Sequence, residues 1–294
     1  MVAKKKNNFG KEKLSPLTAV LLAVLIAYVA IMCLMFLWAV MTSFKSPAGY
    51  HQDKVGFPTD PYFNYLYVFS VFEVTMSGVT HSMLRMLGNS LLYALGCSLA
   101  KATVTCVVAY LSARYAYKFS KVVYTIVIVS MVTPVVGSLP SELQMAMNLG
   151  LYNSIPGQWV MKCNFLGMYF LVFYEFFKSM PKSYTEAAEI DGASDWKILT
   201  SIAFPLVSFT FLSVVLIYFI EYWNDYQIPL AFMPDQPTLA YGMYFLANGA
   251  GVNELKKVPY IMTMAIMVLV PILVLFLCCH KRLLGNLNVG GIKG

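Results

Sequence analysis

Charged side chains are scarce in this chain of 294 residues. Asp, Glu, Lys and Arg make up 12% of the sequence and hydrophobic residues 59%, against roughly 25% and 45–50% in soluble domains. Too few charges are present to cover the surface of a soluble domain of this size. The composition therefore excludes an ordinary soluble protein and predicts an all-α protein that lies in a membrane.

The motifs that usually carry catalysis and nucleotide binding are also missing. The sequence has no Gly-x-x-x-x-Gly-Lys-Ser/Thr loop, and neither Gly-x-Ser-x-Gly nor His-Glu-x-x-His. We therefore expect a protein that is not an enzyme and carries no cofactor. If its function depends on ATP, the nucleotide and its Mg²⁺ are expected on a partner chain.

Histidine and cysteine are few and scattered. None of the six cysteines forms a Cys-x-x-Cys pair, and His51, His81 and His280 do not cluster, so no metal site is expected. The cysteines fit small apolar positions between helices better than a disulfide framework. The net charge of +7 is not gathered into a basic domain, and no nucleic-acid partner is expected.

Long apolar runs are the main positive feature. A hydrocarbon core of about 30 Å requires about 20 apolar residues per helix, and segments in lipid must be helical because no water satisfies their backbone groups. The first run is too long for a cleaved signal peptide and is expected to remain as an anchor. Six runs are predicted to span the membrane: 18–41, 87–112, 122–139, 158–177, 204–223 and 259–279.

The distribution of Lys and Arg predicts the orientation of these spans. Fourteen of the 21 basic residues fall on one alternating set of connections, which includes both termini. Because cytoplasmic connections carry the excess of basic residues, we expect a cytoplasmic segment at 1–17, a six-span domain at 18–279 and a cytoplasmic tail at 280–294.

One cytoplasmic connection has an unusual pattern. Ser183 and Glu186 have the spacing of a capping box, and Gly192 is suited to end a short helix in the left-handed conformation. Ser194 is predicted to cap a second helix, and Pro205 falls at the first turn of the fifth span, where its missing N–H does no harm. The acid-rich first helix is unlike the basic helices that lie on membranes. It is predicted to dock against a partner.

This connection resembles the EAA loop of the membrane subunits of bacterial ABC importers. The matching residues are Glu186, Ala187, Ala188, Gly192, Ile202 and Pro205, and Phe204 stands where the family has Leu. The run from Glu186 to Ser194, the Trp223-Asn224-Asp225 segment and the glycine-rich tail 290–294 resemble the carbohydrate branch, in particular the maltose-type second permease. The resemblance extends from about residue 85 to the end.

The resemblance implies an assembly. The partners would be a second homologous permease, an ATPase dimer that binds ATP and Mg²⁺, and an extracellular sugar-binding protein, at the bacterial plasma membrane. The loop would sit in a cleft of the ATPase and pass its motion to the spans, and the tail would lie between the two ATPase subunits. The residues implied in coupling are Glu186, Ala187, Ala188, Glu189, Asp191, Gly192, Ile202 and Pro205.

Polar residues inside or at the ends of the spans are candidates for a substrate path. Lys101 lies within the second span, where a charge costs about 2.5–3.5 kcal/mol on insertion scales, and Glu221 is a candidate partner. The alternatives are a snorkelling lysine or a structural ion pair, and an aromatic belt at the membrane boundary. The candidate set is Lys101, Tyr218, Glu221, Trp223, Asn224 and Asp225.

Two further expectations concern the last third of the chain. Residues 227–258, rich in Pro and Gly, are predicted to form turns rather than a span and, by resemblance, to reach toward the binding protein. Pro271 is predicted to kink the sixth span. Two rival functions stay open: an ABC importer permease for another solute, and a stand-alone secondary transporter, although the paired inverted repeats of many such transporters are not visible. A membrane-embedded enzyme is the weakest alternative.

Overall fold

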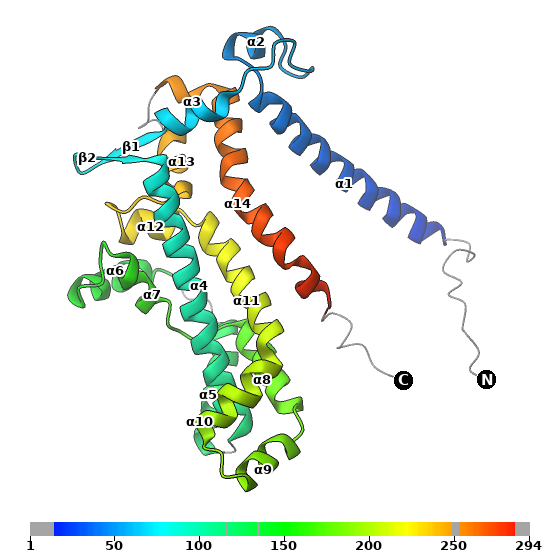
Figure 1. The fold of residues 1–294 in the computed structure, drawn as a ribbon, viewed down its shortest axis with the longest axis vertical. Coiled ribbons are helices and arrows are strands. Elements are labelled where there is room, and N and C mark those ends of the chain that lie inside the picture. Colours follow the sequence, from blue (N-terminus) through cyan, green and yellow to red (C-terminus); the bar gives the residue numbers. More distant parts are fainter. Residues whose placement is uncertain (1–14, 116, 134–135, 249–252, 286–294) are drawn as a thin grey trace. The chain divides into compact units, whose positions relative to one another are not determined.

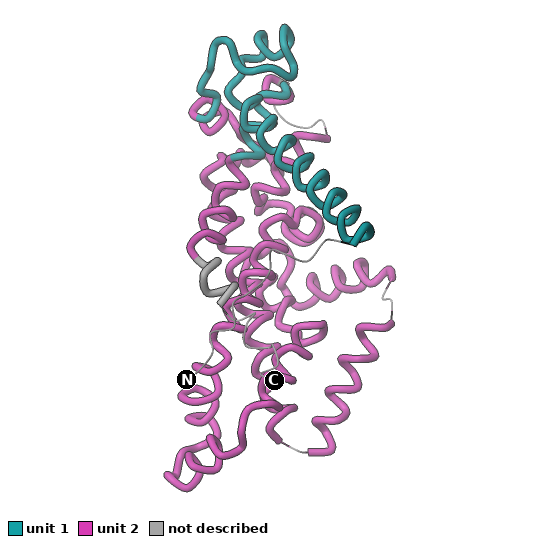
Figure 2. The backbone as a smooth tube through the Cα atoms, turned by 90° about the vertical axis from the view of Figure 1, so that its right-hand side faces the viewer, with its two compact units in different colours: residues 1–65, 257–266 teal, residues 66–256, 267–294 magenta. Residues whose placement is uncertain are grey.

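The structure is a computed structural model that describes residues 15–115, 117–133, 136–248 and 253–285. Most of the described chain is helical, and its strands form a single two-stranded sheet (Figure 1). The chain divides into two compact units, residues 1–65 with 257–266 and residues 66–256 with 267–294 (Figure 2). The N-terminal lysines and the glycine-rich tail 290–294, both predicted to be cytoplasmic, lie outside the described residues.

Helix α1 (Pro16–Ser43) makes up much of the first unit. The Ser15 hydroxyl caps it by accepting a hydrogen bond from the Thr18 amide at 3.2 Å. At 1.5 Å per residue its 28 residues extend about 42 Å, more than the core of a bilayer. Its only buried residues are Thr42 and Ser43 at the end, so the apolar side chains of α1 are free to face lipid or another subunit.

Polar contacts gather at the end of α1. The Asn64 amide donates to the carbonyls of Ser43 and Lys45 at 2.8 and 2.9 Å. The Thr263 hydroxyl, near the start of α14 (Val258–Gly285), donates to the same Ser43 carbonyl at 3.2 Å. These bonds stabilise the chain that leaves α1, including the short helix α2 (Pro47–Gln52).

The second unit begins within α3 (Asn64–Val71), and a hairpin follows this helix. Strand β1 (Glu73–Met76) pairs antiparallel with β2 (Val79–Ser82), and Val74 lies opposite His81. The two turn residues, Ser77 and Gly78, both have positive φ, 48° and 80°, as type I′ hairpin turns require. The hairpin leads directly into α4 (Met83–Arg114).

Helix α4 is the centre of the second unit. It packs against α7 (Ile155–Met161), α8 (Met168–Ser179) and α11 (Phe204–Asn224). Small residues let helices approach closely in membranes, and small or polar residues make up much of the buried face of α4: Asn89, Ser90, Ala94, Cys97, Ser98, Ala102, Thr105, Cys106 and Ala109.

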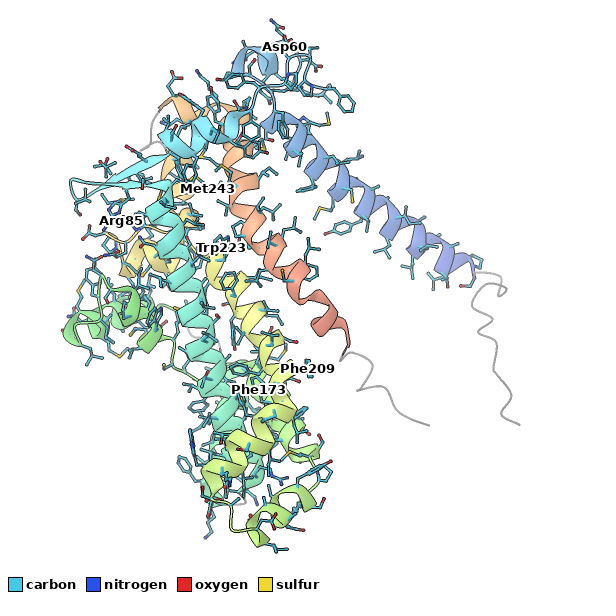
Figure 3. The ribbon with its side chains drawn as sticks, in the orientation of Figure 1. Asp60, Arg85, Phe173, Phe209, Trp223 and Met243 are labelled. Carbon is cyan, nitrogen blue, oxygen red and sulfur yellow. The ribbon has the colours of Figure 1, made fainter. Side chains whose placement is uncertain are left out.

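Gly96 shows how close this packing is. A Cβ atom at Gly96 would lie 2.0 Å from Nε1 of Trp159 on α7. The indole crosses the glycine and donates to the Leu92 carbonyl at 3.0 Å. Trp223 of α11 and Phe173 of α8 are also buried in this unit (Figure 3), so aromatic rings fill the space around the small residues of α4.

Two of the predicted spans are shorter than expected. Among the described residues, four helices are long and apolar enough to cross a membrane: Pro16–Ser43, Met83–Arg114, Asp195–Asn224 and Val258–Cys278. The predicted third span is α5 (Lys118–Val132), which is 15 residues long. The predicted fourth span is interrupted between α7 and α8, where Gly167 has φ 130°. Hydrophobicity alone did not show this break, because the residues around Gly167 are apolar.

The segment 227–258 contains more helix than expected. It forms α12 (Gln227–Phe232), α13 (Leu239–Ala247) and a 3₁₀ turn at Asn253–Lys256. The prediction that this segment is not a span is confirmed among the described residues, since none of these helices is long enough to cross a membrane, but part of it is helical where turns were expected. Helix α14 continues through Pro271; a kink there stays a prediction. The other helices are α6 (Leu139–Asn148), α9 (Ser183–Ile190) and α10 (Asp195–Ile198).

Candidate functional site

The predicted helix and glycine corner are present in the loop after α8. Helix α9 ends at Ile190, and Gly192 follows with φ 75°. The Gly192 amide bonds to the Glu189 carbonyl at 3.0 Å and the Ala193 amide to the Ala188 carbonyl at 2.9 Å. These two bonds form a Schellman motif, which turns the chain sharply between α9 and α10.

The predicted capping box at the start of α9 is wrong. Lys182 takes the N-cap position in a helical conformation, and no side chain caps the helix. The Lys182 carbonyl instead accepts from the amides of Thr185 and Glu186 at 2.9 and 3.0 Å. Ser183 is already inside the helix, where its hydroxyl cannot serve as an N-cap. The start of α9 must therefore be held in another way.

Helix α10 runs without a break into the fifth span. The Ser194 hydroxyl caps it as predicted, accepting from the Lys197 amide at 3.4 Å. A π-helical turn, Leu199–Ala203, follows and includes the half-buried Ile202. Pro205 is then the second residue of α11. The chain after the corner at Gly192 is therefore continuous helix into α11, so that a movement of α10 would be passed directly to α11.

The residues of the loop face different ways. Ala188 is buried, whereas Glu186, Ala187 and Glu189 are exposed. Ile190 is exposed to 86%, more than most of the large apolar side chains of the described residues. The predicted slim docking face therefore includes Ala187 but not Ala188, which packs inward. Asp191 and Gly192 are exposed beside Ile190.

Two residues at the end of α4 contact this loop and were missed as site residues by the sequence analysis. The Arg114 guanidinium donates to the Met180 carbonyl at 3.0 Å and to the Thr185 hydroxyl at 2.6 Å. The side chain of Tyr115 lies close to that of Asp195 at the start of α10. In the sequence Arg114 counted only as a positive charge near a span end; a basic residue that ends a long helix was the available signal.

Part of the predicted substrate path does come together. The Lys101 ammonium lies 4.7 Å from the centre of the Tyr218 ring, within the range of a cation–π contact. Tyr169 of α8 packs edge-on against Tyr218, with ring centres 5.1 Å apart. The predicted pairing of Lys101 with Glu221 is absent as an ion pair in the described chain. An aromatic face, and not a carboxylate, is the direct partner of this lysine.

A second lysine lies nearby. Lys162, between α7 and α8, is 5.9 Å from the centre of the Tyr222 ring. Tyr222 packs edge-on against Tyr93, and the Tyr93 hydroxyl donates to Asp225 at 2.9 Å. The sequence analysis missed Lys162 and Tyr93 because both lie in apolar surroundings and far from Asp225 along the chain.

Three of the four remaining predicted path residues make structural contacts. The Trp223 indole is buried and donates to the Val268 carbonyl at 3.1 Å. The other Asp225 oxygen accepts from the amides of Gln227 and Ile228 at 2.9 and 3.1 Å, which caps the start of α12. Asn224 is exposed and bonds back to the Ile220 carbonyl within its own helix. Glu221 is exposed.

A polar junction joins three connections at the hairpin end of the second unit. Asp235, between α12 and α13, accepts hydrogen bonds from the Ser77 hydroxyl and from the Asn153 amide, the latter at 2.7 Å. The Asp235 backbone amide donates to the Asn153 side-chain oxygen at 3.1 Å. These side-chain bonds, first from Ser77 and then from Asn153, lower the pKa of Asp235 below its ordinary value of 3.8.

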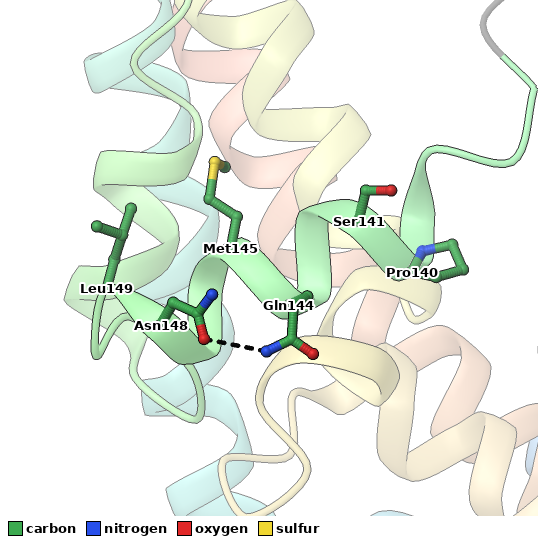
Figure 4. A pocket seen from close by; sticks show the side chains of 6 residues that line it. All are labelled: Pro140, Ser141, Gln144, Met145, Asn148 and Leu149. Atoms are coloured by element: carbon green, nitrogen blue, oxygen red, sulfur yellow. Dashed lines mark hydrogen bonds between the residues drawn. The ribbon is translucent and has the colours of Figure 1, made fainter.

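An open cavity beside α6 contains none of the predicted residues. It measures about 760 Å³ and is lined by α6 and the residue that follows it (Figure 4). The Gln144 side chain donates to the side-chain oxygen of Asn148, one turn further along α6, at 3.0 Å. All its lining residues come from one short stretch of chain, so it is a concavity beside a single helix and not a site built by several elements.

Comparison with known proteins identifies the family. A model described as "Binding-protein-dependent transport system inner membrane component" matches residues 105–283. NgcG, a diacetylchitobiose uptake permease of Streptomyces coelicolor, is 25% identical over 92% of this chain and 87% of its own. MelC, a melibiose/raffinose/stachyose import permease of Bacillus subtilis, is 31% identical over 63% and 67%. UgpE, an sn-glycerol-3-phosphate permease of Escherichia coli K12, is 28% identical over 69% and 72%.

A solved structure shares the fold. A chain of a bacterial ABC transporter involved in the import of the acidic polysaccharide alginate matches with a TM-score of 0.76 at 19% identity, covering 92% of this chain and 99% of that one. The family model spans more than half of the sequence and includes the corner at Gly192 and the helices on either side. The chain therefore belongs to the family of inner membrane components of binding-protein-dependent transport systems, the permease subunits of ABC importers.

Proposed function

We propose that this permease imports a sugar or short oligosaccharide together with a second homologous permease, two ATPase subunits and an extracellular sugar-binding protein. Two of the relatives are named for oligosaccharide uptake, which supports a carbohydrate. The ATP and Mg²⁺ belong to the ATPase subunits. In this proposal the chain crosses the membrane six times, with α5 and the α7–α8 region as its two shorter crossings and both termini in the cytoplasm.

The coupling role rests on the geometry of the corner at Gly192. Helix α9 presents Ala187 and Ile190 to the outside of the chain, while α10 continues directly into α11. A partner that grips α9 can therefore tilt a helix that reaches the substrate path at Tyr218. The exposed Ile190 supports this, because burial of such a side chain against a partner contributes about 1.5–3 kcal/mol.

The substrate path is proposed to run past Lys101, Tyr169 and Tyr218. Aromatic faces bind the apolar faces of sugar rings, and ammonium groups bind hydroxyls. Tyr218 and Lys101 lie on the two helices that pack most closely in the second unit. A phosphorylated polyol is the second candidate, because UgpE is among the relatives and a second lysine, Lys162, lies over the ring of Tyr222 on the same helix as Tyr218.

A substitution on the exposed face of α9 tests the coupling role. Ala187→Arg places a long charged side chain on the docking face without disturbing the interior of this chain, because Ala187 is exposed. We expect sugar uptake to be abolished and co-purification of the ATPase to be lost, while the permease stays in the membrane at its normal amount. Ala187→Ser, which adds one hydroxyl, is the matched control and should transport normally.

The outcome separates docking from misfolding. Ala188→Arg introduces the same side chain one residue later, at a buried position, and should lower the amount of folded permease. Normal uptake by a complex that contains Ala187→Arg would refute docking through this face. Substrate class is tested separately, by measuring which of maltose-type oligosaccharides and glycerol phosphate stimulates ATP hydrolysis with each candidate binding protein.

A further inference from the structure

We propose that Arg114 is a positioning residue that fastens the start of α9 to the end of α4, so that α4 moves with α9 during transport. The proposal rests on the proposed coupling function of α9. Arg114 lies in the last turn of α4 and was not among the residues implied by the sequence pattern of the loop.

The contacts of Arg114 bracket the entry to α9. One guanidinium nitrogen donates to the carbonyl of Met180, which follows α8, and the other donates to the hydroxyl of Thr185 in the first turn of α9. The Thr185 hydroxyl in turn donates to the Lys182 carbonyl at 2.8 Å. A planar guanidinium can hold two acceptors in a fixed geometry, which a lysine ammonium cannot reproduce.

Helix α9 has little else to fix it to the interior. Of its eight residues, all described, Ala188 is the only buried one. Its N-terminus lacks a side-chain cap. A cavity of about 340 Å³, lined in part by Arg114, Thr185 and Glu189, lies between the helix and the end of α4. With so few apolar contacts, charge-assisted hydrogen bonds are the main mechanical link at this point.

A second contact places the end of α4 against both sides of the corner. Tyr115, the residue after Arg114, lies close to Asp195 in the first turn of α10. The end of α4 thus holds α9 through Thr185 and lies next to α10 at Asp195. Helix α4 also carries Lys101, which contacts Tyr218 of α11. Arg114 therefore provides a route from the docking helix to the substrate path that does not pass through Gly192.

The experiment compares Arg114 and Thr185 variants in the reconstituted complex, with binding protein and sugar present. Arg114→Ala and Thr185→Val should each lower sugar-stimulated ATP hydrolysis roughly tenfold, since one charge-assisted hydrogen bond is of that size. The ATPase should still co-purify, because the exposed face of α9 is unchanged. Thr185→Ser keeps the hydroxyl and should restore stimulation. The double variant should be no worse than Arg114→Ala.

Matched controls exclude a general effect of charge. Lys118→Ala removes an exposed positive charge from the neighbouring start of α5 and should leave stimulation unchanged, whereas Arg114→Lys should be impaired although its charge is kept. Full stimulation in both Thr185→Val and Arg114→Ala would overturn the proposal. So would equal impairment by Lys118→Ala, which would indicate a simple interaction with the membrane surface.

Failure of this proposal is distinguishable from failure of the proposed function. If Ala187→Arg abolishes uptake and the Arg114 and Thr185 variants are normal, α9 couples to transport but Arg114 does not fasten it. If Ala187→Arg is itself normal, docking through α9 is refuted, and the role of Arg114 in delivering that motion is refuted with it.

Discussion

The two ends of the second unit are held together in opposite ways. At the hairpin end, Asp235 joins three connections through bonds to Ser77 and Asn153, and the strand residues beneath it are partly buried. At the other end, α9 buries only Ala188 and is attached by the guanidinium of Arg114. The hairpin end is held by several hydrogen bonds among three connections. At the other end, α9 is attached to α4 mainly through the hydrogen bond between Arg114 and Thr185.

This difference has an energetic meaning. A segment tied to its neighbours by several contacts opens locally at a higher free energy than one with few buried contacts and exposed hydrogen bonds. A permease that is driven by an ATPase on one side of the membrane needs a movable element on that side and a rigid region elsewhere. We call the hairpin end of the second unit, around Asp235, the frame. We therefore expect substitutions at the corner to change transport, and substitutions at the junction to change stability.

We expect the hairpin end to face the outside of the cell and the α9 end to face the cytoplasm. The largest expected effect tests this orientation. In a variant free of the native cysteines, an impermeant thiol reagent should label Thr80→Cys from outside intact cells and should not label Lys197→Cys until the membrane is opened. Thr80 is exposed on the hairpin and Lys197 on α10. The expected effect is all or none, because basic residues are retained on the cytoplasmic side.

Labelling of Lys197→Cys from outside would invert the orientation and remove the ATPase from the reach of α9. An unlabelled Thr80→Cys in opened and intact cells alike would mean that a partner covers the hairpin. The two positions therefore test orientation and accessibility separately, and each serves as the control for the other.

The junction is expected to show an intermediate effect, on stability. Asn153→Gly removes both side-chain bonds to Asp235 and should lower the free energy of unfolding by about 1 kcal/mol, the usual contribution of partly exposed hydrogen bonds. Asn153 has φ 56°, so Asn153→Ala should cost roughly 1–2 kcal/mol more, because its Cβ is strained in that conformation. Thermal unfolding of the purified complex measures both.

Transport provides the second half of this test. Both Asn153 variants should keep normal sugar-stimulated ATP hydrolysis at temperatures where the complex is folded. Loss of stimulation without loss of stability would contradict the assignment of this end as a frame. An Asn153→Ala variant no less stable than Asn153→Gly would contradict the role of backbone strain.

The sequence predicted the geometry of the corner at Gly192 well because local chemistry determines it. Gly192 adopts positive φ and Ser194 caps the next helix, as their positions indicated. Both signals act within four residues. The predicted capping box is absent because α9 begins one residue earlier than expected. Lys182 takes the N-cap position, so Ser183 lies inside the helix and cannot cap it.

The sequence predicted contacts between distant residues poorly. Lys101 was expected to pair with Glu221 of α11. It contacts instead the ring of Tyr218, which lies one turn before Glu221 on that helix. Arg114 and Asn153 were invisible as partners of Thr185 and Asp235, since separations of 71 and 82 residues leave no periodic pattern. The break at Gly167 was hidden because hydropathy averages over the residues around it.

The smallest expected effect concerns the pH dependence of the frame. His81 of β2 is buried, and neither ring nitrogen has a hydrogen-bond partner. Burial, and then the positive charge of Arg85 at the start of α4 (Figure 3), lower its pKa, while Asp235 acts in the opposite direction. The imidazole therefore stays neutral in the folded chain at pH values where it is protonated in the unfolded chain.

A depressed pKa in the folded state gives a defined sign to the effect. Stability from the neutral His81 is fully present above the unfolded value of 6.5 and is lost as the pH falls below it, because only the unfolded chain then gains the proton.

His81→Phe, which fills the same space without titrating, should flatten the fall in Tm between pH 7 and pH 5 by a few degrees. Asp235 also has a depressed pKa, but its contribution is lost only below pH 3.8, outside this window. An identical fall in Tm in His81→Phe and in the parent complex would show that another group is responsible and that the hairpin end is not sensitized to acid through this histidine.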